Sequence, residues 1–182
     1  MKRLALTALI LGSVLGGLAA GPAVAALTDG APAPDFTAQA SLGGKEFNFS
    51  LADALKKGPV VLYFYPAAFT KGCTIEAHDF ADATDKFAAL GATVIGVSHD
   101  DIATLDKFSV SDCRSKFAVA ADPDGKVIRA YDTKMTLLPY SDRTSYVIAP
   151  DHTILLVYSA GNPDKHVEMT MDAVQKWHDA HK

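Results

Sequence analysis

The sequence predicts an α/β fold in which a mixed central β-sheet is flanked by helices. Two continuous apolar runs, at residues 60–65 and 92–98, are typical of strands that are buried on both faces of a sheet. A helical pattern of apolar residues follows each run, and the last part of the chain adds two more strand patterns and a closing helix. Strands that alternate with helices and end in a hairpin favour helices packed on one mixed sheet.

An N-terminal β-hairpin is expected ahead of the first central strand. Residues 36–40 and 45–49 have strand patterns, and the Gly43-Gly44 pair between them can adopt the positive φ angles of a tight turn. Ser50 is a suitable cap for a short helix over residues 50–57, which leads into the first central strand.

Each central strand is expected to be followed by a helix. The first helix begins near Gly72 and continues until Gly91 interrupts its pattern. After the second strand, Ser98 and Asp101 lie three residues apart, as the two partners of a helix-capping box do. We therefore expect the second helix to begin at this pair and to run toward Cys113.

The C-terminal part begins with a short strand over residues 117–121, which ends in the turn Asp122-Pro123-Asp124-Gly125. This turn has the start of a calcium-binding loop, but it lacks the remaining oxygen ligands and the terminal Glu, so we interpret it as a turn only. Residues 144–148 and 153–159 predict an antiparallel hairpin at the sheet edge, and the Asn162-Pro163 pair is a typical helix start.

The N-terminus predicts a secretory signal peptide over residues 1–25. It has a basic start, an apolar run over residues 4–20 and the small-residue site Ala23-Val24-Ala25. We therefore expect cleavage after Ala25, an exported, periplasmic protein, and a single domain over residues 26–182 that is not attached to a membrane. The alternative is a retained anchor, because the apolar run is about as long as the shortest membrane-spanning helix.

Size and charge exclude several classes of partner. The 182 residues are 49% hydrophobic and 21% charged, which suits one compact domain. The formal net charge is −4 and becomes more negative when the signal peptide leaves with Lys2 and Arg3, so no basic cluster remains for nucleic acid or an anionic membrane surface. Small molecules and thiol proteins are the expected partners, and we expect a monomer or a weak homodimer.

Cys73 is the principal candidate for chemistry. It falls in the first turn of the helix after the first central strand, where free N–H groups and the positive end of the helix dipole favour a thiolate. Thr70, in the loop before the helix, can turn its hydroxyl toward the sulfur, and Pro66 ends the strand and shields the sulfur from water. A thiolate in this position is a nucleophile, whereas a lone cysteine without such a context is more often a buried structural residue.

The spacing Pro66-x-x-x-Thr70-x-x-Cys73 resembles the active-site motif of the peroxiredoxins, which are thiol peroxidases with a thioredoxin-like fold. The wider run 65–77 is most similar to the bacterioferritin comigratory, or PrxQ-like, branch. The resemblance implies reduction of hydrogen peroxide and organic hydroperoxides through a sulfenic acid at Cys73. It also implies a thioredoxin-like or other thiol reductant, no cofactor and no metal ion.

A second active-site signature lies further along the chain. The run Arg143-Thr144-Ser145-Tyr146, just before a predicted strand, resembles the family motif that supplies the arginine partner of the thiolate. The resemblance gives this arginine the role of holding the thiolate and the peroxide, which a fixed guanidinium suits because charge moves onto the departing oxygen. It also gives Thr70 a hydrogen bond to the peroxide and Glu76 a supporting position in the pocket.

The sequence leaves the resolving step open. Many PrxQ-like chains have a resolving cysteine five residues after the peroxidatic one, and here that position is His78. Cys113, near the end of the next helix, is the candidate resolving residue, as in other peroxiredoxins with a second cysteine on that helix. A disulfide with Cys73 requires local unwinding unless the two Cα atoms lie within about 7 Å. The alternative is reduction by an external thiol, with Cys113 a bystander.

Other functions on the same kind of fold fit these residues less well. A thiol–disulfide oxidoreductase needs Cys-x-x-Cys, and Glu76 occupies the position three after Cys73. A copper-delivery module needs a second cysteine where Ala77 stands, and Cys73 and His78 face different sides of a helix. The remaining alternative is an exported thioredoxin-fold protein with a structural Cys73–Cys113 disulfide and no peroxidase activity.

Overall fold

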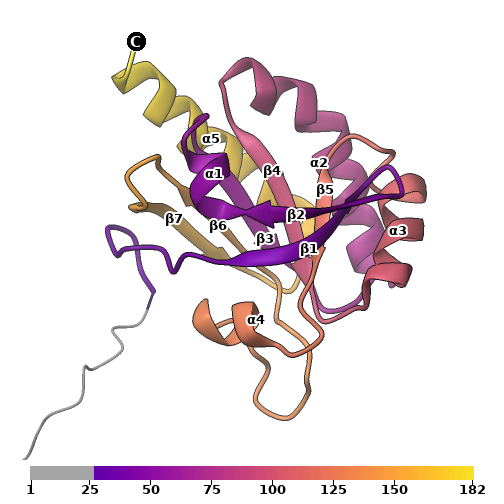
Figure 1. Cartoon of the computed structure of the whole chain (residues 1–182). Coiled ribbons are helices and arrows are strands. Elements are labelled where there is room, and N and C mark those ends of the chain that lie inside the picture. Colours follow the sequence, from indigo (N-terminus) through magenta and orange to yellow (C-terminus); the bar gives the residue numbers. More distant parts are fainter. Residues whose placement is uncertain (1–26) are drawn as a thin grey trace, which may run out of the picture.

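The computed structural model describes residues 27–182, and the predicted signal peptide lies outside them (Figure 1). The chain forms a seven-stranded sheet in the order β2-β1-β5-β4-β3-β6-β7. The strands are β1 (Thr37–Leu42), β2 (Lys45–Ser50), β3 (Val60–Phe64), β4 (Thr93–Ser98), β5 (Ala118–Ala121), β6 (Thr144–Ile148) and β7 (Ile154–Ser159). The helices are α1 (Leu51–Leu55), α2 (Lys71–Ala89), α3 (Ile102–Ser111), α4 (Lys126–Ala130), the short 3-10 helix η1 (Pro163–Lys165) and α5 (His166–Ala180). Within the described range, no helix combines the length and the hydropathy needed to cross a membrane.

The two predicted central strands, β3 and β4, lie side by side and pair in parallel. All five residues of β3 are buried, because helices cover both faces of the sheet. β6 pairs with β3 in the antiparallel direction, with Phe64 opposite Thr144, and β7 forms the edge beyond it. The sheet is therefore mixed, as predicted, and the start of β6 lies beside the end of β3.

The N-terminal hairpin has the predicted form. β1 and β2 pair in the antiparallel direction along their whole length, and the turn residues Gly43 and Gly44 take φ angles of 57° and 75°. Ser50 caps α1 as predicted, because its hydroxyl oxygen accepts the Asp53 N–H. β1 also pairs with β5, which joins the hairpin to the sheet.

Helices cover the two faces of the sheet unequally. The long helices α2, α3 and α5 pack on the face that carries Val61 and Tyr63 of β3 (Figure 1). The short helices α1 and α4 pack on the opposite face, which carries Leu62 and Phe64. The alternating side chains of one buried strand therefore contribute to two hydrophobic cores, one on each side of the sheet.

Two local features differ from the sequence prediction. The predicted capping box of α3 is wrong: Asp101 caps the helix, with its carboxylate accepting the Thr104 N–H at 2.7 Å, whereas Ser98 donates to Asp100. The sequence did not predict α4, because five residues are too few to show a helical period. The Asp122 side chain stabilises this helix by accepting two N–H groups from its first turn.

Gly96 lets β4 pass close to the ring of Tyr63. The two residues are neighbours in the register of β3 and β4, and a Cβ atom on Gly96 would lie 2.7 Å from a carbon of that ring. The ring is stacked on Phe80 with the centroids 4.5 Å apart, so it has little room to move aside.

We expect Gly96→Ala to lower the free energy of unfolding by about 1–3 kcal/mol through overpacking. Chemical denaturation measures this change. Gly161→Ala is the control, because a Cβ there meets no atom within 4 Å. Equal stabilities of the two variants would contradict the prediction.

Candidate active site

The loop between β3 and α2 supports the candidate site. Ser141 donates a hydrogen bond to the Tyr65 carbonyl at 2.8 Å. The Ala68 N–H donates to the Asp100 carboxylate, also at 2.8 Å. Because side chains from two other segments hold this loop, the first turn of α2 is presented in one position.

Cys73 lies in the first turn of α2, as predicted, with 1% of its surface exposed. The guanidinium of Arg143 reaches the same point, and its Nη2 lies 3.5 Å from Cys73 Sγ. The antiparallel pairing of β3 with β6 brings these residues together although they are 70 positions apart in the sequence. A neighbouring guanidinium and a helix N-terminus both stabilise a thiolate.

Glu76 lies one turn further along the same face of α2 and forms a buried ion pair with Arg143 through Oε2 and Nη1. Arg143 also donates from Nε to the Gly161 carbonyl at 3.2 Å, which fixes the guanidinium plane. Burial raises the pKa of Glu76 to about 8, although Arg143 acts in the opposite direction. One guanidinium therefore faces two acidic groups, the Cys73 thiol and the Glu76 carboxyl.

Thr70 and Pro66 lie in the loop ahead of Cys73, as the motif requires. Thr70 is exposed at the N-cap position of α2, and its hydroxyl donates to the Ala67 carbonyl at 2.9 Å. Pro66 is half-buried at the end of β3. The structure thus brings Cys73, Arg143 and Glu76 into contact, whereas the Thr70 hydroxyl is engaged by its loop bond to Ala67.

Gly72 keeps the space that the guanidinium occupies. A Cβ atom on this residue would lie 3.0 Å from Arg143 Nη2, the nitrogen that faces the sulfur. We expect Gly72→Ala to slow the reaction of Cys73 with hydrogen peroxide by on the order of tenfold, since misplacing a catalytic group by 1 Å can cost about 100-fold.

The second-order rate constant measured by stopped flow tests this expectation. Gly161→Ala is the matched control, because it adds the same methyl group where no atom lies within 4 Å and leaves the carbonyl that Arg143 uses. Rate constants that are equal in the two variants would show that the guanidinium tolerates the methyl group.

Cys113 lies two residues beyond the end of α3 and is fully buried. Both cysteines are free thiols within the same hydrophobic core, which also contains Tyr63 and Tyr65. Burial raises the pKa of the Cys113 thiol, and the neighbouring Asp112 acts in the same direction. The thiol is therefore a weak nucleophile where it stands.

The segment 112–116, which carries Cys113, is held against α2 by charged contacts and has an unusual backbone. Arg114 and Ser115 take φ angles of 49° and 55°, a region that non-glycine residues enter at a cost. Three pairs of side chains connect the segment to α2: His78 with Asp112 at 3.9 Å, Arg114 with Asp82 at 2.6 Å, and Lys116 with Asp85 at 3.1 Å. The Arg114 and Lys116 pairs are solvent-accessible, so each of these two outer contacts stabilises the segment weakly.

Sequence reasoning missed three residues that shape the site: Asp100, Ser141 and His166. Asp100 follows the end of β4, at the carboxyl edge of parallel strands where binding residues often gather, so its position was a usable signal. Ser141 lies just before the second signature. His166 has no sequence signal, because only the packing of α5 brings its Nδ1 to 3.6 Å from Glu76 Oε1.

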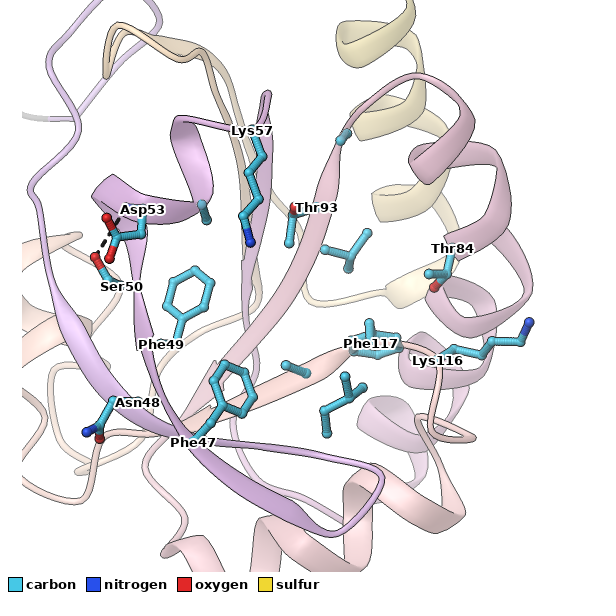
Figure 2. Close-up of a pocket in the computed structure, with 15 residues that line it drawn as sticks. Phe47, Asn48, Phe49, Ser50, Asp53, Lys57, Thr84, Thr93, Lys116 and Phe117 are labelled. Atoms are coloured by element: carbon cyan, nitrogen blue, oxygen red, sulfur yellow. Dashed lines mark hydrogen bonds between the residues drawn. The ribbon is translucent and has the colours of Figure 1, made fainter.

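A separate hollow of about 410 Å³ lies beside the N-terminal hairpin (Figure 2). Its lining includes Phe47, Phe49, Lys57 and Phe117, but neither Cys73 nor Arg143. The candidate chemistry therefore does not depend on this hollow. Among residues 27–182, no three His, Cys, Asp or Glu side chains are grouped in a way that could hold a metal ion.

Comparison with known proteins places this site in a family. The sequence profile of the AhpC/TSA family matches residues 30–157, more than half of the chain. The chain belongs to the AhpC/TSA family of peroxiredoxins. It is therefore a thiol-dependent peroxidase, and the resemblance seen in its motifs is confirmed.

Individual relatives support the PrxQ-like assignment. A chloroplastic peroxiredoxin Q of Gentiana triflora is 35% identical over 153 residues, which cover 83% of this chain and 68% of the relative. A putative peroxiredoxin of Mycobacterium tuberculosis is 38% identical over 127 residues, 68% of this chain and 77% of the relative. The crystal structure of peroxidoxin BcpB from Mycobacterium tuberculosis has a TM-score of 0.75 and 31% identity, covering 82% of this peroxiredoxin and 97% of that chain.

Proposed function

We propose that this peroxiredoxin reduces hydrogen peroxide and small organic hydroperoxides through a sulfenic acid at Cys73. The observation that carries the proposal is the buried contact between Cys73 Sγ and Arg143 Nη2 at 3.5 Å, in the first turn of α2. The thiolate attacks one peroxide oxygen and the O–O bond breaks. Cys73 becomes S–OH, and the departing oxygen takes a proton and leaves as water or an alcohol.

The other motif residues have assigned parts in this proposal. Arg143 holds the thiolate and stabilises the charge that develops on the leaving oxygen. Thr70, after rotating from the Ala67 carbonyl, contributes a hydrogen bond to the peroxide, and the Cys73 N–H holds an oxygen. Pro66 limits access of water at the mouth of the site, and Glu76 orients the guanidinium from behind.

For the resolving step we propose that Cys113 attacks the sulfenic acid, so that a Cys73–Cys113 disulfide forms and water leaves. The buried Cys113 thiol must first come free of the core, and the positive φ angles and weak outer contacts of segment 112–116 favour local opening there. A thioredoxin-like or other thiol protein then reduces the disulfide by thiol exchange.

Intact mass spectrometry after one equivalent of hydrogen peroxide tests the proposal. In the reduced wild-type protein we expect the loss of about two hydrogens, and in Cys113→Ser the gain of one or two oxygens. Oxygen gain in both proteins would mean that an external thiol resolves the sulfenic acid. No mass change in either would overturn the peroxidatic role of Cys73.

We further propose that the protein is exported to the periplasm and acts as a monomer or a weak homodimer. The basic start, the apolar run and the small-residue site at residues 1–25 support export. N-terminal sequencing of the protein from cell fractions decides this point. A periplasmic chain that begins at Ala26 would support export, whereas a membrane-bound chain that begins at Met1 would indicate a retained anchor.

A further inference from the structure

His166 is a buried histidine directly behind the ion pair of the active site. It is the first residue of α5 and has no exposed surface. Its Nε2 lies 3.0 Å from the Ala160 carbonyl, which can only accept a hydrogen bond, so Nε2 carries a hydrogen. The other nitrogen, Nδ1, lies 2.8 Å from the Ser145 hydroxyl and 3.6 Å from Glu76 Oε1.

The carboxyl group of Glu76 is satisfied on one side only. Oε2 is bound by Arg143, whereas Oε1 is buried and has no hydrogen-bond partner among the described residues. A buried carboxylate oxygen without a partner is costly, and such an atom calls for a physical explanation. The imidazole Nδ1 that faces it at 3.6 Å can exchange a proton with it after a shift of a few tenths of an ångström.

The charge balance of the site also calls for an additional proton. Arg143 is one cation, and a Cys73 thiolate with a Glu76 carboxylate makes two anions, all on buried side chains. Either Glu76 or His166 must hold a proton if the buried cluster is to be neutral.

We propose that His166 is a positioning residue of the peroxidatic site, which shares one buried proton with Glu76 and so leaves the charge of Arg143 available to the Cys73 thiolate. With the proton in place, Glu76 orients the guanidinium without drawing its full charge. Without it, the carboxylate competes with the sulfur for the same cation. The Ser145 hydroxyl can donate to Nδ1 or accept from it, so it serves the shared proton in either position.

The surroundings of the pair are consistent with this role. Burial raises the pKa of Glu76 to about 8 and lowers that of His166, so it favours the uncharged form of both groups. Arg143 lowers the pKa of both, and Asp79 raises that of Glu76. The ring of Tyr158 packs edge-on against the imidazole, with the centroids 4.8 Å apart.

The test measures the pH midpoint of Cys73 alkylation by iodoacetamide, in a Cys113→Ser background where one thiol remains. We expect His166→Asn to raise this midpoint by roughly one unit, because the asparagine amide can donate to Glu76 Oε1, keep Glu76 ionised and so draw the charge of Arg143 away from the sulfur. His166→Leu offers this oxygen no donor, so burial keeps Glu76 protonated and the midpoint should not rise.

A double-mutant cycle separates positioning from packing. In Glu76→Gln, which has no carboxylate to compete, His166→Asn should change the midpoint by less than about 0.2 units. Val174→Ala is the control, because it removes buried volume from the same helix without touching the pair, and it should lower stability but not move the midpoint. An unchanged midpoint in folded His166→Asn, or an equal shift in the Glu76→Gln background, would overturn the proposal.

The proposal rests on the proposed function only in taking Cys73 as the reacting thiol. Alkylation needs no peroxide, so the coupling of His166 to Cys73 is measured even if peroxide turnover does not depend on Cys73. Conversely, if peroxide turnover requires Cys73 but the alkylation midpoint is unchanged in His166→Asn, the role of His166 is rejected and the proposed function stands.

Discussion

Replacing Cys73 by serine should abolish peroxide turnover, with a loss on the order of 10⁴-fold or more. A serine hydroxyl in the same helix turn is not ionised near neutral pH, so the site would keep its guanidinium and lose its nucleophile. Consumption of hydrogen peroxide with dithiothreitol as reductant measures the loss. The small change in side-chain size at this buried position should leave the fold intact, which circular dichroism can verify.

Cys113→Ser is the matched control for this experiment. It makes the same chemical change at the other buried thiol, and it should leave the reduction of the first equivalent of peroxide unchanged. Turnover in Cys73→Ser at the wild-type rate would reject the assignment of Cys73. If Cys113→Ser lost the reduction of the first equivalent of peroxide to the same extent as Cys73→Ser, both thiols would be needed for the peroxide step.

Arg143→Ala should slow the peroxide step by about 10²–10³-fold, the usual effect of removing a preorganised group that stabilises transition-state charge. Arg143→Lys should recover only part of this loss, because a lysine cannot reach Cys73 and Glu76 with one planar fork. Arg129→Ala, at an exposed position of α4, is the control and should retain the wild-type rate. Equal rates in Arg143→Ala and Arg129→Ala would exclude a role for this guanidinium.

Arg143→Ala should also alter how the free energy of unfolding depends on pH, because Arg143 lowers the pKa of Glu76. Its pKa is about 8 in the folded wild type against 4.5 as the reference, so its stabilising contribution is complete below about 4.5 and is lost as the pH rises toward 8. Arg143 lowers this pKa, so its removal raises it further and the loss continues above pH 8. In a Cys73→Ser background, the deficit in unfolding free energy of Arg143→Ala should therefore grow above pH 8. A deficit that stays constant above pH 8 would show that Arg143 does not affect the ionisation of Glu76.

The fold and much of the site could be predicted because they depend on strong local patterns. The unbroken apolar run at β3 has one plausible place, the middle of a covered sheet, and the glycine pair at 43–44 has one plausible use, a tight turn. The position of Cys73 followed from the strand, loop and helix order. Arg143 could be assigned only because its surrounding run resembles a known signature, since nothing local tells where an arginine at a strand start will point.

The remaining features depend on tertiary packing that no local pattern encodes. The predicted pair Ser98 and Asp101 and the observed pair Asp101 and Thr104 are both three residues apart. Spacing alone therefore could not tell which residue caps α3. His166 lies behind Glu76 because η1 connects β7 to α5 and places the first residue of α5 in the protein interior. Glu76 Oε1 has no hydrogen-bond partner among the described residues, and this follows only from the way α2, β6 and α5 pack together.

The pairing of β3 with β6 has a consequence for the life of the chain before it is folded. Arg143 meets Cys73 only when these strands adopt the register that sets Phe64 opposite Thr144, and a slip of one residue would send its side chain to the other face. An unfolded chain therefore has no guanidinium held beside Cys73. Under the proposed function, Cys73 gains its reactivity toward peroxide only when β3 and β6 have paired in this register.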